Sequence, residues 1–244
     1  MRLKNVIRAV VCVMAFAFAG CSGTAGFRNK EALGEQSLKG ATVLIVAPQV
    51  QLYEIGVGQQ KSRRADLEEP LRKTAVDAIT EFAQESGWFK VATMPKLNDS
   101  EQYEFDQRMT LLYSNQLEYA AFKTKKGGAL AEVEDRLNAS VGRSSLTGEV
   151  INRTGARYAL LFAGSDSYTT ASAKLVSLAS AVVTMGNTPM ALTGLGTLTV
   201  CVIDLQTGKV IWMADDTSKR DLTDKDNQKK MLRTLLKRSP LGGD

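Results

Sequence analysis

Histidine is absent from the 244-residue sequence, and cysteine and proline are scarce, with three and five copies. Without histidine the chain cannot form a Ser-His-Asp or Cys-His triad, and it lacks the imidazole ligands of common zinc sites. It also lacks the side chain that most often acts as a general base near neutral pH. No paired carboxylates, metal-ligand spacing or glycine-rich phosphate loop stands out in their place. The sequence therefore predicts a protein that is not an enzyme, with no cofactor and no catalytic or metal site.

The apolar run near the N-terminus is too short to cross a bilayer as a helix. Residues 9–19 form an uncharged run of eleven residues, and residues 2–8 before them contain three basic side chains. A membrane-spanning helix needs about 20 residues, whereas this length and this basic start are typical of a signal peptide. We therefore expect residues 1–20 to be a signal peptide.

The residues that end this run, Phe18, Ala19, Gly20 and Cys21, resemble the lipobox of bacterial lipoproteins, whose usual form is Leu-Ala-Gly-Cys. The resemblance implies cleavage before Cys21, lipid attachment to its sulfur, and acylation of the new amino group by palmitate or a similar chain. Two or more acyl chains hold a protein stably on a membrane, whereas one does not. Ser22, where inner-membrane lipoproteins of this type tend to have Asp, implies sorting to the outer membrane. We expect a lipid anchor there, facing the periplasm; the alternative is an ordinary secreted protein.

Removal of the signal peptide changes both the charge and the thiol count. The full chain has 31 basic and 26 acidic residues, and residues 1–20 hold three basic residues and no acidic one, so the mature chain has 28 against 26. This near balance, without a basic stripe interleaved with aromatics, argues against a nucleic-acid partner. Cys12 leaves with the signal peptide and Cys21 becomes a thioether. Cys201 is then the only free thiol, within an apolar stretch typical of a buried strand.

The mature chain is expected to divide into a lipidated flexible tether, residues 21–40, and a single periplasmic domain, residues 41–240. The tether is small and polar in composition. A β-branched run at 42–48 predicts a buried strand, followed by a loop through residue 64, and 88–95 predicts a second strand. A helix between them, capped by Asp66 and Glu69 with Pro70 in its first turn and ended by Gly87, would make the sheet partly parallel. Its apolar face comprises Leu67, Leu71, Ala75, Ala78, Ile79 and Phe82.

The rest of the domain is predicted to consist of helices followed by strands. Residues 99–155 are predominantly helical, with stretches predicted at 129–138 and 145–152. A first helix is predicted before residue 123, and one of its faces comprises Phe105, Met109, Leu112, Tyr113, Gln116 and Ala120. Residues 157–164 predict another buried strand.

The C-terminal part of the chain predicts a β-hairpin and then a helix. Strands at 197–204 and 209–215 flank a turn in which Gly208 takes the left-handed conformation. A helix over 223–238, capped by Thr223 and Asp226, completes the chain. The predicted class is α/β (α+β), a mixed sheet flanked by helices with a C-terminal β-hairpin followed by a helix.

The C-terminal half resembles the family of the curli-secretion lipoprotein CsgG, with its relatives LpoB and the amino-terminal domain of TolB. The shared pattern is a Gly-Ala-x-Tyr strand start followed by a strand, an Asp-x-x-Thr-Gly turn and a strand ending in Trp. Here it comprises Gly155, Ala156, Tyr158, Asp204, Thr207, Gly208, Val210, Ile211 and Trp212. The resemblance covers 155–237 well and 40–94 weakly. It implies a non-catalytic periplasmic domain that presents surfaces to copies of itself, to a synthase or to a secreted subunit.

Residues 175–203 contain no charged side chain. In the curli lipoprotein the corresponding segment inserts into the membrane, which leaves a pore-forming channel subunit as one alternative. The apolar residues do not alternate with polar ones as in a membrane strand, and no aromatic residue is present to form a girdle. An exposed apolar surface of this size more often marks an interface between proteins. The interface residues that this predicts are Leu175, Val176, Leu178, Val182, Val183 and Met185.

Three functions are therefore considered from the sequence. The first is a non-catalytic, outer-membrane-anchored lipoprotein that oligomerises or docks partners in cell-envelope assembly or secretion. The second is a CsgG-like channel subunit or an activator of a peptidoglycan synthase. The third is an enzyme, for which the candidate side chains are Asp166, Asp204, Ser165 and Tyr168. Asp204 is better explained as a turn residue, and Asp166 as a residue at the end of a strand.

Overall fold

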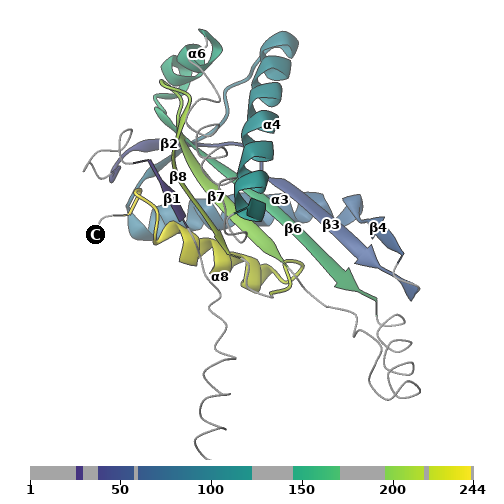
Figure 1. Cartoon of the computed structure of the whole chain (residues 1–244). Coiled ribbons are helices and arrows are strands. Elements are labelled where there is room, and N and C mark those ends of the chain that lie inside the picture. The colour runs from purple at the N-terminus through teal and green to yellow at the C-terminus, as the bar shows by residue number, and fades with distance from the viewer. Residues whose placement is uncertain are drawn as a thin grey trace, which may run out of the picture.

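The computed structural model describes residues 26–29, 38–57, 60–122, 145–170, 196–216 and 220–242. The described residues form eight strands and four helices (Figure 1). The strands are β1 (Gly26–Arg28), β2 (Thr42–Ile45), β3 (Gln49–Ile55), β4 (Lys61–Arg63), β5 (Lys90–Ala92), β6 (Tyr158–Thr169), β7 (Thr197–Asp204) and β8 (Lys209–Asp216). The helices are α3 (Ala65–Ser86), α4 (Asp99–Phe122), α6 (Ser145–Thr154) and α8 (Lys225–Leu236).

The sheet is mixed, and β6 is its central strand. Its order is β1-β8-β7-β6-β2-β5, with neighbours antiparallel from β1 to β6 and parallel from β6 to β5. β2 pairs with the first residues of β6, and β3, which begins just after Pro48, pairs with the last seven. β4 lies outside β3. The parallel pairing of β2 with β5 confirms the partly parallel sheet that the strand–helix–strand pattern predicts.

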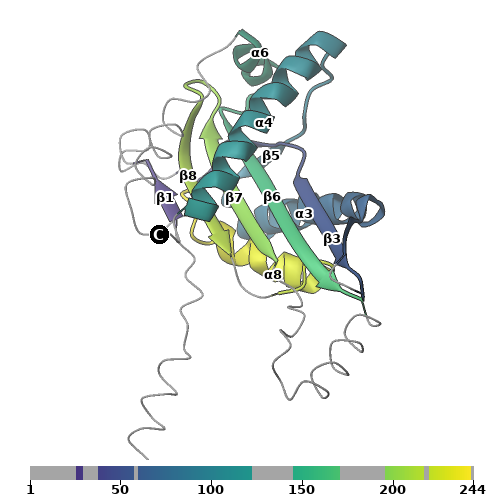
Figure 2. The same cartoon turned by 45° about the vertical axis from the view of Figure 1, so that its right-hand side comes forward.

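Helices cover both faces of the sheet because successive strand residues point to opposite faces. On β6, Leu160 and Phe162 join one buried cluster, and Ala159 and Leu161 join the other. α3 and α8 complete the first cluster, and α4 and α6 complete the second. In Figure 2, α4 crosses the face of the sheet turned to the viewer, and α3 lies behind the strands. The mixed α/β class, with helices flanking the sheet, is confirmed.

The loop predicted over residues 49–64 is wrong, because β3 and β4 occupy much of it. β3 alternates between exposed and buried side chains, with Val50 and Leu52 buried and Gln49 and Gln51 exposed. Alternation of this kind is typical of a half-buried strand, and the sequence prediction missed it because it identified strands by continuous apolar runs. The second predicted strand, at 88–95, is shortened to the three residues of β5.

α3 begins differently from the predicted capped helix but ends as predicted. Its N-cap residue, Arg64, makes no side-chain capping bond, and Pro70 lies inside the helix rather than in its first turn. The predicted cap at Asp66 is wrong because that carboxylate binds the Arg64 guanidinium instead. The C-terminus is as predicted: Gly87 adopts φ 63° and donates its N–H to Ala83. The predicted apolar face is buried apart from partly buried Leu67.

The C-terminal β-hairpin and helix are confirmed. β7 and β8 pair antiparallel, and Gly208 in their turn adopts φ 70°. The register shifts beside Val202 and Ile203, so that Ile211 and Trp212 both pack into the first cluster. α8 is capped by Asp224, which accepts from the N–H groups of Asp226 and Asn227, and not by Thr223 as predicted. The buried side chains Met231, Leu232, Leu235 and Leu236 form its predicted apolar face.

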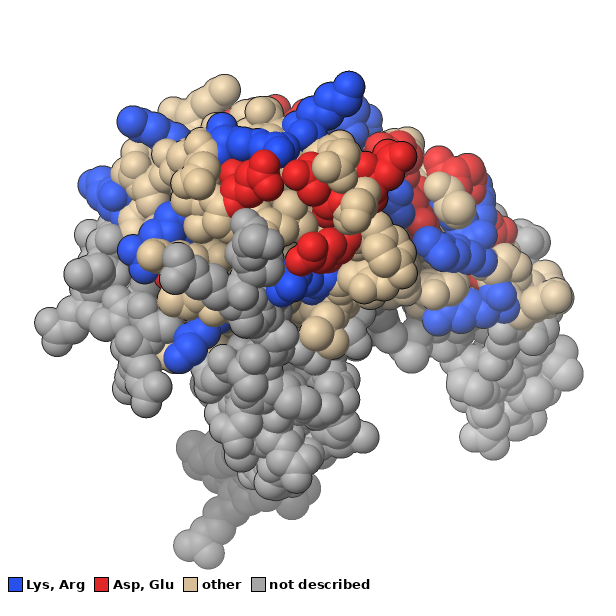
Figure 3. All heavy atoms as spheres, turned by 90° about the horizontal axis from the view of Figure 1, so that it is seen from above, with Lys and Arg blue, Asp and Glu red and all other residues tan. Residues whose placement is uncertain are grey.

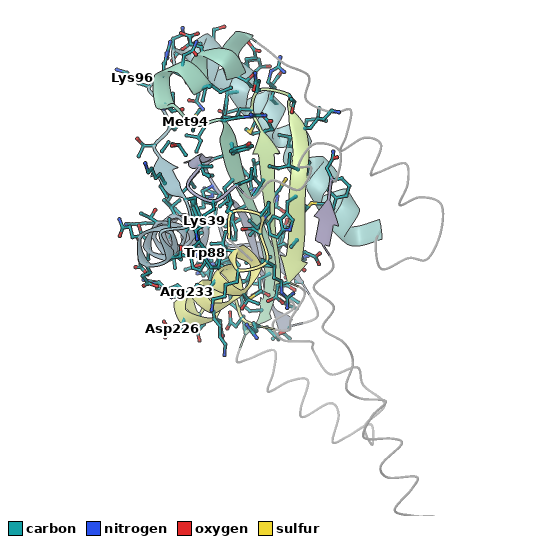
Figure 4. All side chains as sticks on the ribbon, turned by 90° about the vertical axis from the view of Figure 1, so that its left-hand side faces the viewer. Lys39, Trp88, Met94, Lys96, Asp226 and Arg233 are labelled. Atoms are coloured by element: carbon teal, nitrogen blue, oxygen red, sulfur yellow. The ribbon has the colours of Figure 1, made fainter. Side chains whose placement is uncertain are left out.

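The predicted tether, residues 21–40, includes residues that belong to the sheet. β1 pairs antiparallel with β8, Phe27 is 8% exposed, and the Asn29 N–H donates to Ile211 O at 3.1 Å. Leu38 donates its N–H to Pro240 O at 2.9 Å, which ties this segment to the C-terminal residues. Lys39 and Trp88 lie along the same side of the molecule as Arg233 in α8 (Figure 4).

The predicted helices over 99–155 are confirmed where they are described. α4 buries Phe105, Met109 and Leu112, and α6 matches the short helix predicted at 145–152. The side chains of Tyr113, Gln116 and Ala120, and the helix predicted at 129–138, lie outside what the structure describes. Within the described part of the chain, no helix has both the length and the apolar character that a membrane crossing requires.

Candidate functional site

The two sets of site residues predicted from the sequence lie outside the described residues, but their attachment points are defined. Cys21 and Ser22 precede Gly26, the first residue of β1. The predicted interface lies between Thr170, which follows β6, and Gly196, which precedes β7. Its residues are Leu175, Val176, Leu178, Val182, Val183 and Met185.

The strand registers bring these attachment points to one end of the sheet. Gly26 pairs with Ala214 near the end of β8, and Asp216, the last residue of β8, pairs with Leu198 at the start of β7. Thr197 in turn pairs with Ser165. β3 runs parallel to β6, so its last residues lie at this same end. We call this end, defined by Gly26, Ile55, Thr170, Gly196 and Asp216, the β6 end; the hairpin turn at Thr207 and Gly208 lies at the opposite end.

A buried carboxylate joins the β6 end to the segment before α8. Asp166 is 1% exposed, and it accepts hydrogen bonds from the N–H groups of Leu222 at 2.8 Å and Ser167 at 2.7 Å. Burial raises the pKa of this carboxyl above its usual range. Asp166 lies within β6, five residues beyond Leu161, and not at the end of the strand as predicted, because β6 continues to Thr169.

Gly196 permits the close approach of this segment. A Cβ atom added at Gly196 would lie 2.4 Å from the carbonyl oxygen of Arg220 and 2.9 Å from Leu222 Cγ. Asp166 and Gly196 therefore act together: one binds the backbone at Leu222, and the other leaves space for it. This arrangement fixes where the chain re-enters the sheet after the predicted interface.

β3, β4 and β6 are joined at the β6 end by a network centred on Arg64. Its guanidinium donates to Tyr168 Oη at 2.7 Å, to both carboxylate oxygens of Asp66 at 2.9 and 2.7 Å, and to Glu54. Tyr168 Oη also donates to Glu54 at 3.1 Å. Burial, followed by the bond to Glu54, raises the pKa of Tyr168. Tyr168 is thus held between charged partners and serves this junction.

A second network next to it is centred on Glu68 in α3. This carboxylate is 2% exposed, and Arg63 donates to both of its oxygens at 2.8 Å. The Leu52 N–H in β3 and the Arg72 guanidinium also donate to it, at 3.3 and 3.2 Å. The hydrogen bond from Arg63 holds the pKa of Glu68 below its usual range. The sequence prediction missed both networks; the charge run at 61–69 is the signal that could have indicated them.

The four side chains considered for an enzyme do not meet at one place. Ser165, Asp166 and Tyr168 lie at the β6 end, whereas Asp204 is paired with Tyr158 at the other end of β6. Eight residues of strand separate the two aspartates along β6, which corresponds to about 26 Å. Asp204 accepts from Arg157 at 2.8 Å and from the Gln206 N–H at 2.8 Å, as a turn residue does.

No residues within the described ranges form a group of three or more His, Cys, Asp or Glu side chains able to hold a metal ion. Cys201 is 2% exposed, and burial raises the pKa of its thiol far above the usual range. This agrees with the expected structural role of Cys201 within a buried strand.

An apolar groove of about 710 Å³ lies between α3 and the edge strand β5. Val76, Thr80 and Ala83 of α3 line one side, and Val91 and Met94 line the other. Figure 4 shows Met94 near Lys96 on the side of the molecule that carries Lys39 and Trp88. A second groove, of about 540 Å³, lies further along α3 against Pro48. Neither groove contains a residue predicted from the sequence to be functional.

Comparison with known proteins assigns no family. No family model matches the sequence, and no curated protein does. Two dodecameric PelC structures from Paraburkholderia phytofirmans are similar to this chain at TM-scores of 0.36 and 0.35, with 13% and 11% identity. They cover 90% and 91% of this chain and 98% of their own. A DUF4136 family protein from Bacteroides thetaiotaomicron is similar at a TM-score of 0.31 and 7% identity, covering 90% of this chain and 96% of that one. Likenesses this distant assign neither a family nor a function.

Proposed function

We propose that this protein is a non-catalytic lipoprotein, anchored in the outer membrane through Cys21 and facing the periplasm, that oligomerises or docks partners in envelope assembly or secretion. The observation that carries the proposal is the basic start, short apolar run and small residues that end at Cys21. Only four residues, 22–25, separate this cysteine from β1, so the anchor would hold a folded domain close to the membrane.

The energetics of acylation support stable anchoring. Each buried CH₂ group of an acyl chain contributes about 0.8 kcal/mol, so one chain binds only marginally and two or three bind stably. Acylation of Cys21 would therefore supply the membrane affinity.

Three buried carboxylates, two of them on side chains considered for an enzyme, bind elements of the fold itself, which favours a docking role over catalysis. Asp166 binds the backbone before α8, Asp204 binds its own turn and Arg157, and Glu68 binds β3 and β4. The surface proposed for partner binding is instead the uncharged segment beyond Thr170, whose apolar residues Leu175 to Met185 would contact a second copy or another envelope protein.

The anchor is tested by replacing Cys21 with Ala and following the full-length protein in the cell. We expect loss of fatty-acid labelling, accumulation of the unprocessed chain and loss from outer-membrane fractions. Cys12→Ala is the matched control, since it removes a cysteine nine residues away within the signal peptide and should change none of these readouts. Ser22→Asp should keep the label but move the protein to the inner membrane. Normal processing and sorting of Cys21→Ala would contradict the proposal.

Docking is tested by crosslinking in intact cells, followed by purification of the acylated protein. We expect either a higher oligomer or a defined envelope protein, and recovery of a peptidoglycan synthase would identify the protein as its activator. Deletion of residues 175–195 should abolish the crosslinks, whereas Leu111→Ser on the exposed side of α4 should not. A strictly monomeric protein without any crosslinked partner would contradict the docking role.

A channel subunit is the second candidate, and the pairing of β6 with β7 favours it. These strands are antiparallel neighbours, and the segment that connects them leaves and re-enters at the same end of the sheet. A membrane strand needs about 9–11 residues, so the connection is long enough for two strands and a turn. Single-channel conductance from the detergent-extracted full-length protein, lost on deletion of 175–195, would favour this candidate over simple docking.

A further inference from the structure

We infer that the β6 end of the sheet faces the membrane surface in the anchored protein, with the hairpin turn and α6 pointing away from it. This inference rests on the proposed lipid anchor at Cys21 and adds the orientation of the domain, which the sequence does not contain. It identifies the surface of a lipid bilayer as the partner of one defined end of the fold.

The length of chain between the anchor and the sheet is the first argument. Cys21 precedes Gly26 by five residues, which span at most about 18 Å when fully extended. Gly26 is not free to move away from the sheet, because β1 pairs with β8 over three residues and Phe27 is 8% exposed in the second core cluster. The attachment point of the lipid is therefore within about 18 Å of a fixed point on the fold.

This length is too short for the inverted orientation. Gly26 is paired with Ala214, and the hairpin turn at Gly208 lies six residues back along β8, or about 20 Å away. α6 has ten residues and is about 15 Å long; it leads into the start of β6 and so lies at that far end as well. If the far end contacted the bilayer, the five-residue link could not reach the membrane surface.

The location of the uncharged segment, residues 175–195, agrees with this orientation, because a docking segment at the β6 end would contact envelope partners close to the membrane. Thr170 and Gly196, between which the uncharged residues 175–195 lie in the chain, are both at the β6 end. The exposed apolar side chain of Val57, which is 54% exposed, follows β3 at this end too. The strand registers thus place the lipid attachment, an exposed valine and both ends of the uncharged segment together.

Electrostatic attraction does not select this orientation. The exposed charges near the β6 end include Lys61 and Lys225 but also Asp221 and Asp226. The upper side of the molecule, seen in Figure 3, likewise shows Lys and Arg mixed with Asp and Glu. Because neither sign dominates, we expect the orientation to be set by the short link, and to persist in zwitterionic lipid and at high salt.

Two exposed threonines provide a matched pair of probe sites. Thr223, beside the start of α8, is at the β6 end, because the neighbouring Leu222 binds Asp166. Thr207 is in the hairpin turn at the other end. In the acylated protein the only remaining thiol, Cys201, is 2% exposed, so Thr223→Cys and Thr207→Cys can each be labelled selectively.

The experiment measures quenching of a fluorophore on each cysteine by nitroxide-labelled headgroups, in phosphatidylcholine vesicles carrying the full-length acylated protein. We expect quenching several-fold stronger for Thr223→Cys than for Thr207→Cys, with no change in high salt. Equal quenching, or stronger quenching at Thr207→Cys, on vesicles that float with the protein overturns the orientation and leaves the anchor intact. Failure of the acylated protein to float overturns the anchor and the orientation together.

A second pair of variants tests the short link. Phe27→Asp should release β1, so that the first described residue tied to the fold becomes Leu38 and the link grows from five to seventeen residues. The difference between the two probes should then collapse, whereas Phe27→Leu should preserve it. An insertion of about ten Gly-Ser residues between residues 24 and 25 should have the same effect as Phe27→Asp without touching the fold. An undiminished difference in the insertion variant overturns the inference.

Discussion

The carboxylate of Glu68 offers the sharpest test of how the β3–β4 corner is held to α3. It is 2% exposed and accepts four hydrogen bonds, two from Arg63, one from Arg72 and one from the Leu52 N–H. Glu68→Ala would leave the buried Leu52 N–H without an acceptor, and an unsatisfied buried donor costs about 1–3 kcal/mol. Since Arg63 is 54% exposed, its guanidinium would regain water, which limits the remaining loss.

We therefore expect Glu68→Ala to lower the free energy of unfolding by about 2 to 3 kcal/mol, and Glu68→Gln by about 1 to 2 kcal/mol because it keeps one acceptor. The adjacent Glu69 is the matched control, since it is 78% exposed and binds Arg72 at 3.2 Å on the surface of α3. Glu69→Ala should leave the stability almost unchanged. Urea denaturation of the chain without its signal peptide measures all three.

The pH dependence provides a second readout for Glu68. Its folded-state pKa is lowered from about 4.5, so the charged form is favoured in the folded state. The stability that this provides is present above the unfolded-state pKa and is lost as the pH falls through the folded-state pKa. The stability difference between the wild type and Glu68→Gln should therefore be constant near pH 7 and shrink below about pH 4.5. A difference that stays unchanged down to pH 3, or a loss in Glu69→Ala equal to that in Glu68→Ala, would refute the reasoning.

The other predictions concern packing at single positions. Gly196→Ala should lower the melting temperature strongly, because the added Cβ would lie 2.4 Å from Arg220 O. An added Cβ at Gly148 in α6 would meet no atom within 4 Å, so Gly148→Ala should raise the free energy of unfolding by about 0.5–1 kcal/mol. Equal effects of the two substitutions would contradict the close approach at Gly196. Cys201 should resist thiol reagents in the folded protein up to pH 9 and react once urea unfolds it, because burial raises its pKa; rapid reaction in the native state would contradict its burial. Leu235→Ala, at a fully buried side chain between α8 and the sheet, should cost about 2–5 kcal/mol by chemical denaturation, and a loss below 1 kcal/mol would place α8 outside the core.

The C-terminal part of the fold could be predicted from the sequence because its signals are local. The turn residue Gly208 and the continuous apolar runs on both sides of it determine β7 and β8, and the spacing of Met231 and Leu235 determines the buried face of α8. β3 has no such continuous apolar run, and its signal is a short alternation of polar and apolar residues. Its pairing with the far half of β6 is a long-range contact, and only Val50 and Leu52 are buried in it.

Helix caps and buried carboxylates were harder to predict, because several side chains compete for the same partner. Asp66 stands where a cap residue is expected, but the Arg64 guanidinium binds both of its oxygens. Thr223 similarly binds Asp221, which leaves Asp224 to cap α8. The role of Asp166 depends on Leu222, 56 residues away in the sequence, and no local pattern contains that contact.

The candidate site is predicted by the sequence in its chemistry but not in its placement. The cysteine at the end of a signal peptide and the uncharged run at 175–195 are both visible in the printed residues. That Gly26 and Gly196 lie at the same end of the sheet follows only from two strand registers taken together, that of β1 with β8 and that of β8 with β7. The orientation inferred for the domain is therefore a property of the topology.

The most direct test of the account is the intact mass of the mature protein purified from cell membranes. A lipid anchor predicts a chain that begins at Cys21, lacks residues 1–20, and carries the added mass of a diacylglycerol and a further acyl group. A chain that begins at another residue, or that begins at Cys21 without any lipid, would contradict it.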